Sequence, residues 1–203
     1  APDRIGFGVL GMSDQPRVLA FAGSARTDSF NVKLVNIAAE GAREAGAEVT
    51  VLNLKDFPMP LFNQDLEAAE GPPEQATRLK GIMLAHEGLL IASPEYNSSI
   101  SPLLKNTIDW VSRPADGEPM LAVYRDKVAA VMSASPGGLG GLRGLVHLRS
   151  FLSNMGVLVI PDQVAVTQTH SAFDDHGNLL DAKRQTSVQG LGRSVVKLIG
   201  WNR

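Results

Sequence analysis

The chain has 203 residues, 44% of them hydrophobic, and a formal net charge of −2 at pH 7. This length suits one domain with a sizeable core, and the balanced charge argues against a nucleic-acid-binding or membrane-surface protein. The absence of cysteine excludes disulfides, thiolate nucleophiles and cysteine-ligated metals, and it fits a cytoplasmic protein. Any redox chemistry would then come from a bound cofactor.

Residues 1–16 precede the first predicted element, and we expect them to be an N-terminal extension, such as a leader or a cloning remnant. Their stretch IGFGVLGM is short and broken by glycines, and it lacks the charge layout and cleavage site of a signal peptide. Met12 is a candidate for the natural start. No apolar run reaches the roughly 18 residues that a membrane-spanning helix requires.

Apolar runs alternate with helical patterns along the rest of the chain. Buried strands are predicted at residues 17–23, 48–54, 88–93 and 127–135, with a broken fifth strand at 157–160 and 163–167. Helices are predicted from about Leu34 to Ala45, over 74–87, from Pro102, up to about Asn154, and from about Asp181 to Gly200. The segment from Pro58 to Pro73 holds four prolines and is expected to be irregular.

Strands that are apolar throughout and separated by helices indicate a parallel sheet that is covered on both faces. Five of them predict a doubly wound α/β sheet, in which ligands bind beyond the carboxyl ends of the strands. The loops after the first, third and fourth strands are therefore the places to look for a binding site.

The loop after the first strand, GSARTDSFN, runs from Gly23 to Asn31. Hydroxyl and amide side chains precede a helix start, where free N–H groups favour an anion; they are Ser24, Thr27, Ser29 and Asn31. Arg26 adds a planar fork that binds two phosphate oxygens. The loop has neither the G-x-G-x-x-G nor the Walker spacing, which favours a single terminal phosphate. The other interpretation is an ordinary capping loop with an exposed arginine.

The loop after the third strand, SPEYNSS, combines a carboxylate, a phenol and an amide. Pro94 stiffens the chain where it leaves the strand. Glu95, Tyr96 and Asn97 would suit the rim of a flat heteroaromatic ring, although a plain turn that leads into the next helix explains them too.

The loop after the fourth strand, SASPGGLGG, has four glycines and a proline. Glycines let the backbone approach a ligand closely and expose its amides. A flexible turn is the alternative interpretation.

These three loops, with the segment SPEYNSSISPLLKNTIDWVS, resemble the NADPH-dependent FMN reductases, over roughly Arg17 to Gly200. The resemblance implies a flavodoxin-like three-layer sandwich with a five-stranded parallel sheet of order 2-1-3-4-5, and an FMN-binding reductase domain over 17–203. It implies that the FMN phosphate is bound by Ser24, Arg26, Ser29 and Asn31. It places Pro94, Glu95, Tyr96, Asn97 and Ser98 along the isoalloxazine ring. Ser135, Pro136, Gly137 and Gly138 would lie on the other side of the ring or at the nicotinamide.

The family further implies that FMN N5 takes a hydride from NADPH or NADH, and that electrons then pass to a quinone, chromate, azo or flavin acceptor at the same site. No residue of the protein need act as a nucleophile, and no metal is expected. The expected partners are a small-molecule acceptor and further copies of the chain, as a homodimer or homotetramer. The proline-rich segment from Phe57 to Asp65 is expected to expose Met59, Leu61 and Phe62 for that association.

Two other functions remain open on the sequence. One is a flavodoxin-like electron carrier without NADPH activity, although its expected acidity is missing at a charge of −2. The other is a non-redox binder of a nucleotide or phosphoribosyl group. Trp110 is expected to be a packing or interface residue, and the segment His170 to Gly177 a solvated loop.

Overall fold

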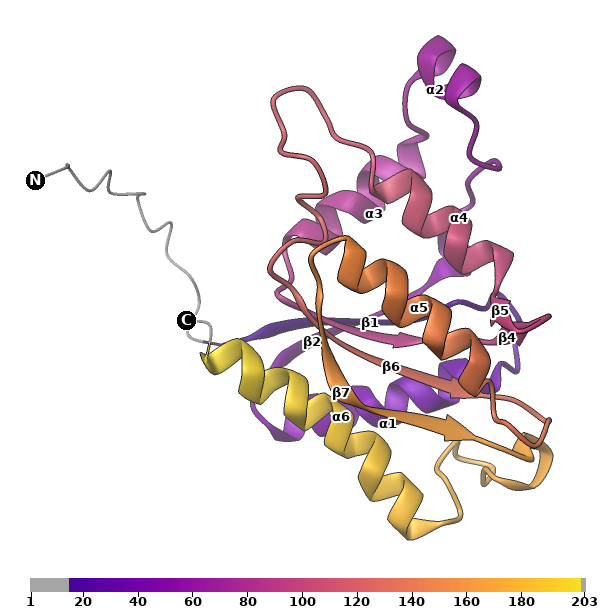
Figure 1. The fold of residues 1–203 in the computed structure, drawn as a ribbon. Coiled ribbons are helices and arrows are strands. Elements are labelled where there is room, and N and C mark those ends of the chain that lie inside the picture. The colour runs from indigo at the N-terminus through magenta and orange to yellow at the C-terminus, as the bar shows by residue number, and fades with distance from the viewer. Residues whose placement is uncertain (1–14, 202–203) are drawn as a thin grey trace, which may run out of the picture.

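The structure is a computed structural model that describes residues 15–201 (Figure 1). The expected start at Met12 and most of the expected extension lie outside these residues. The strands of the main sheet are β1 (Arg17–Ala22), β2 (Glu48–Asn53), β3 (Gly88–Ala92), β6 (Val128–Ala134) and β7 (Leu158–Val166). A small hairpin is formed by β4 (Glu95–Tyr96) and β5 (Ser99–Ile100). The helices are α1 (Phe30–Glu44), α2 (Gln64–Glu70), α3 (Glu74–Leu84), α4 (Pro102–Val111), α5 (Leu142–Asn154) and α6 (Ala182–Trp201).

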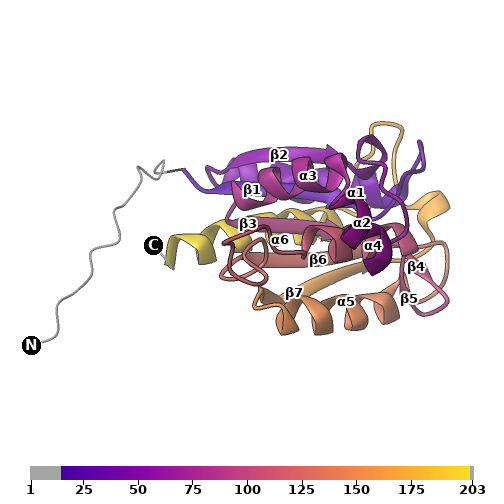
Figure 2. The same ribbon diagram turned by 90° about the horizontal axis from the view of Figure 1, so that it is seen from above.

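The five strands of the main sheet are all parallel, in the order β2-β1-β3-β6-β7 (Figure 2). This is the predicted order 2-1-3-4-5 when the strands of the main sheet are counted along the chain. Helices α1 and α6 cover one face, and α3, α4 and α5 cover the other (Figure 1). The flavodoxin-like three-layer sandwich is thus confirmed. No helix within residues 15–201 is both long and apolar enough to cross a bilayer.

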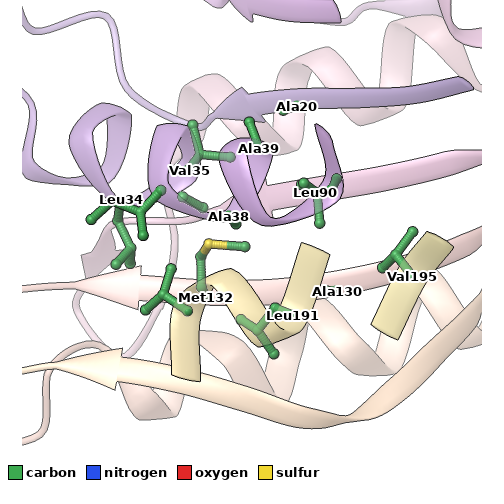
Figure 3. Packing of buried hydrophobic residues seen from close by; sticks show 14 of the residues in the cluster. Ala20, Leu34, Val35, Ala38, Ala39, Leu90, Ala130, Met132, Leu191 and Val195 are labelled. Atoms are coloured by element: carbon green, nitrogen blue, oxygen red, sulfur yellow. The ribbon is translucent and has the colours of Figure 1, made fainter. Parts of the chain in front are cut away.

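Side chains alternate between the two faces because successive residues of a strand point in opposite directions. In β1, Val18 and Ala20 pack under α1 and α6, whereas Leu19 and Phe21 pack under the helices of the other face. Figure 3 shows the first of these layers, in which side chains of the sheet meet those of both helices. The apolar runs of the sequence are therefore strands that are buried on both faces of the sheet.

Helices α1 and α6 touch through their backbones. A Cβ atom added to Gly41 of α1 would lie 2.0 Å from the carbonyl oxygen of Gln189. One added to Gly192 of α6 would lie 2.0 Å from the carbonyl oxygen of Ala38. Because backbone atoms have no rotamer to change, neither position has room for a side chain.

Four predicted elements differ from the structure, and the first of them, α1, begins at Phe30, four residues before its predicted start near Leu34. The proline-rich segment contains helix α2, which Asn63 caps by accepting from the Asp65 N–H at 2.8 Å and which Gly71 ends with φ +77°. Helix α3 ends at Leu84, three residues early, since the His86 ring bonds back to the Ile82 carbonyl at 2.7 Å. The fifth strand is continuous but shifts register near Pro161, which lacks an N–H and is tolerated on an edge strand.

The amino-terminal ends of β1, β3 and β6 are closed by a buried polar cluster. The Glu87 carboxylate accepts from the Arg17 backbone N–H at 2.8 Å, and the Lys127 ammonium donates to the His86 carbonyl. Burial lowers the pKa of Lys127 to about 8; the Glu87 carboxylate opposes this and Arg17 adds to it. A lysine charge is therefore held inside the protein at neutral pH at some cost in stability.

Replacement of Gly192 by alanine should lower the free energy of unfolding by about 1–3 kcal/mol or more, because the new methyl group meets the backbone of α1. Urea unfolding of the variant measures the loss. Gly190→Ala is the matched control on the same helix, since nothing lies within 4 Å of a Cβ at that position. The control should be neutral or stabilising by up to about 1 kcal/mol. Equal effects of the two substitutions would contradict the close contact.

Above about pH 8, the free energy of unfolding of the native protein should rise with pH when it is compared with that of the Lys127→Met variant. Lysine in the unfolded chain titrates near 10.5 and Lys127 in the folded chain near 8, so between these values the unfolded chain binds more protons. The difference in unfolding free energy should therefore grow in favour of the native sequence, by at most about 1.4 kcal/mol per pH unit. Chemical denaturation at pH 7.5, 8.5 and 9.5 measures it, with the exposed Lys183→Met as control. If the difference in unfolding free energy does not change across this range, burial does not lower the pKa of Lys127.

Candidate functional site

The carboxyl ends of β1, β3 and β6 lie side by side, so their three loops meet at one edge of the sheet. A depression of about 370 Å³ opens between the first two loops. It is lined by Gly23, Ser24, Ala25 and Arg26 on one side and by Tyr96, Ser101, Pro102 and Leu103 on the other. The structure thus brings together the two loops for which the sequence predicts a phosphate end and a ring end.

The Ser101 hydroxyl joins the end of the second loop to the start of the first. It donates to the Gly23 carbonyl at 2.6 Å and accepts from the Leu104 N–H at 3.1 Å, as the predicted cap of α4. A Cβ on Gly23 would lie 2.8 Å from the Leu104 Cβ, so the first loop passes directly over the start of α4. Glycine at this position lets the loop come that close.

Three groups of the first loop are available to an anion. Ser29 is buried and caps α1 by accepting from the Val32 N–H at 3.4 Å, and the first-turn N–H groups of the helix face the loop. The Ser24 hydroxyl accepts from the Arg26 N–H at 3.3 Å. Arg26 is exposed, and its guanidinium has no hydrogen bond or ion pair with any residue in the described range. A free guanidinium beside a helix start is well suited to a phosphate.

The Asn31 side chain has a different partner from the expected one. Its Oδ1 accepts from the Ala134 N–H and its Nδ2 donates to the Ala134 carbonyl, both at 2.9 Å. The amide is buried and ties the first turn of α1 to the end of β6. The side chain is therefore engaged within the protein.

The loop after β3 is a short hairpin, which the sequence analysis missed. Glu95 pairs with Ile100 and Tyr96 with Ser99. The two turn residues, Asn97 and Ser98, have φ of 50° and 67°, as in a type I′ turn. Asparagine is common at such positions, and the pair N-S between EY and SI was the available signal. The hairpin leaves Tyr96 51% exposed at the depression.

The Glu95 carboxylate points to α5. Its Oε1 accepts from Arg143 Nε at 3.0 Å and Nη2 at 2.7 Å, and its Oε2 accepts from the Gly144 N–H at 3.1 Å. Burial raises the pKa of this carboxyl, but the hydrogen bonds from Gly144 and Arg143 outweigh burial and lower the pKa below its ordinary value. The carboxylate therefore stays charged at neutral pH.

The glycine loop after β6 is exposed from Pro136 to Leu139. Its start is fastened by the Ser135 N–H, which donates to the Val166 carbonyl at 3.0 Å. A Cβ on Gly141, at φ +90°, would lie 1.9 Å from the Ser133 hydroxyl, so this end of the loop requires glycine. The predicted site residues that lie on this edge but outside the lining of the depression are Ser29, Asn31, Pro94, Glu95, Asn97, Ser98, Ser135, Pro136, Gly137 and Gly138.

Trp110 is a packing residue, as predicted. It is 1% exposed, donates from its indole N–H to the Pro60 carbonyl at 2.8 Å and meets the Phe62 ring edge-on at 4.9 Å. The expectation that Met59 and Phe62 are exposed is wrong, since both are half-buried against the core or Trp110. Only Leu61 of the three is largely exposed, at 79%.

The segment from His170 to Gly177 lies at the surface, with both histidines exposed and His170 edge-on to Phe30 at 5.6 Å. Within residues 15–201, no group of three or more His, Asp or Glu side chains is placed to hold a metal ion.

Comparison with known proteins agrees with this arrangement. The family model for NADPH-dependent FMN reductase matches residues 16–171. An NAD(P)H-dependent FMN reductase of Pseudomonas aeruginosa is 35% identical over 179 residues, covering 88% of this chain and 92% of that protein. The NADPH:quinone oxidoreductase of Arabidopsis thaliana is 36% identical over 168 residues, with 81% and 82% covered.

Solved structures agree as well. The flavoenzyme NAD(P)H:(acceptor) oxidoreductase FerB of Paracoccus denitrificans is 30% identical with a TM-score of 0.75, covering 91% of this chain and 97% of that one. An archaeal flavodoxin, 10% identical with a TM-score of 0.59, covers 91% and 99% and shows the fold alone. The chain belongs to the NADPH-dependent FMN reductase family.

Proposed function

We propose that the chain binds FMN across the depression between the loops after β1 and β3, and that it uses NADPH or NADH to reduce quinones there. Membership of the family makes the chain an oxidoreductase with FMN as cofactor and a reduced nicotinamide nucleotide as electron donor. The observation that carries the site is the depression itself, which has the unpaired Arg26 guanidinium at one wall and the exposed Tyr96 ring at the other.

The residues present fit the two ends of FMN. A guanidinium, two serine hydroxyls and the first-turn N–H groups of α1 are the donors that a phosphate monoester takes. We assign the phosphate to Ser24, Arg26, Ser29 and the backbone of Asn31. Pro102 and Leu103 give the depression an apolar wall, which suits a flat ring with few polar atoms. We assign the rim of the ring to residues 94–98, with Glu95 contributing only its backbone, and its other side to Ser135, Pro136, Gly137 and Gly138.

FMN held by these residues would supply the redox chemistry, namely acceptance of a hydride from the nicotinamide at N5 and transfer of electrons to an acceptor. The protein has to hold the ring with one face open, so that donor and acceptor use the same place in turn. Relatives named as quinone reductases support a quinone as the acceptor. Chromate, azo compounds and free flavins are further proposed acceptors at this open face.

A homodimer or homotetramer built on residues 57–65 is also proposed, and the exposed Leu61 supports it. The cytoplasmic location, expected from the absence of cysteine, stays a prediction.

Replacement of Arg26 by alanine should weaken FMN binding by about 1.5–3 kcal/mol, the range of a hydrogen bond to a charged group. Titration of the apoprotein with FMN, followed by flavin fluorescence, measures the dissociation constant. Arg43→Ala is the matched control, because Arg43 is an exposed arginine at the far end of α1. An unchanged dissociation constant for Arg26→Ala would remove this residue from the phosphate site.

Initial rates with NADPH and a quinone should give parallel double-reciprocal lines, because the two substrates occupy one open face in turn. Intersecting lines would mean that both substrates bind together and would overturn the shared site.

A direct test of reduction comes before the kinetics. NADPH should bleach the yellow protein under argon, and a quinone should restore the colour. A protein that keeps its colour with both NADPH and NADH would instead be an electron carrier.

A further inference from the structure

We propose that Glu95 is a positioning residue, whose carboxylate fastens the β4–β5 hairpin to the start of α5 and so sets the direction in which Tyr96 faces the flavin ring. The proposal rests on the FMN site proposed above and gives Glu95 a task other than contact with the ring.

The carboxylate is fully engaged away from the depression. Both of its oxygens accept hydrogen bonds, one from Arg143 and one from the Gly144 N–H in the first turn of α5. Only 9% of the side chain is exposed. A negative charge at a helix start is favourable, because the first N–H groups are free and the helix end carries partial positive charge.

Two glycines let the hairpin lie directly against α5. A Cβ on Gly144 would lie 3.1 Å from the Ser99 carbonyl oxygen and 3.5 Å from the Glu95 Cβ. One on Gly141 would lie 3.6 Å from the same Glu95 atom. His147, one turn further along α5, adds a contact to the Ser99 hydroxyl at 3.0 Å. The hairpin is thus held along one side by α5, with Glu95 as its charged link.

The hairpin needs such support, since it has only two residues in each strand. A two-stranded hairpin is marginally stable by itself, and both residues of this turn are non-glycine residues at positive φ. Its orientation must therefore come from contacts outside the hairpin. Tyr96 follows Glu95 directly, so a change in the direction of Glu95 moves the phenol ring at the depression.

The test uses the apoprotein carrying Glu95→Gln, Arg143→Gln or both. Glutamine keeps the shape but removes the charge and cannot satisfy Arg143 and Gly144 as a carboxylate does. We expect Glu95→Gln to weaken FMN binding about tenfold, as expected for loss of one charge-assisted contact. The visible circular dichroism of the flavin at saturating FMN should change too, since it reports how the ring lies. Arg143→Gln should change the FMN affinity and the flavin dichroism in the same direction. The double variant should bind FMN no more weakly than Glu95→Gln does.

His147→Ala is the control on the same helix, because it removes a contact to the hairpin without touching Glu95, and it should leave the flavin dichroism as it is. Native affinity and dichroism in Glu95→Gln would overturn the proposal, and so would independent, multiplicative effects of the two substitutions. If Glu95→Gln does not fold, the flavin dichroism of Arg143→Gln tests the proposal instead. The Arg143 side chain is 58% exposed, so its replacement should leave the fold intact. Failure of the site itself is distinguishable, since Arg26→Ala would then leave FMN binding unchanged.

Discussion

The hydroxyl of Ser101 makes the two contacts on which the rest of the binding edge depends. By donating to the Gly23 carbonyl it holds the loop after β1, and by accepting from the Leu104 N–H it starts α4. The hydroxyl is buried, so loss of either bond would leave an unpaired polar group inside the protein. The Ser101 side chain therefore fixes the distance between the two walls of the depression, which are formed by Arg26 on one side and Leu103 on the other.

Polar groups are treated differently at the two ends of the parallel strands. At the amino-terminal edge, Lys127, His86 and Glu87 meet partners within the protein, and the charge of Lys127 is buried. At the carboxyl ends, the exposed Arg26 guanidinium is left to the solvent or to a ligand. This asymmetry follows from the parallel sheet, which places the starts of all its strands on one side and their ends on the other.

Much of the fold could be predicted because strands buried on both faces leave a plain apolar pattern, and β1, β3 and β6 were found in this way. The three loops could be located for the same reason. What the sequence could not show were partners far along the chain. Asn31 reaches Ala134 across 103 residues, and Glu95 reaches Gly144 across 49. Local patterns carry no sign of such pairs, so both side chains were expected to face the ligand.

Gly41 of α1 lies directly against the backbone of α6. The family match ends at residue 171, yet α6 covers β3 and β6 on the face that it shares with α1. Helix α1 begins at the loop after β1, and the backbone of α6 lies directly against α1 at Gly41 and Gly192. The last helix therefore acts as a spacer for the first. A side chain larger than glycine at Gly41 or Gly192 would meet the backbone of the other helix and so displace α1.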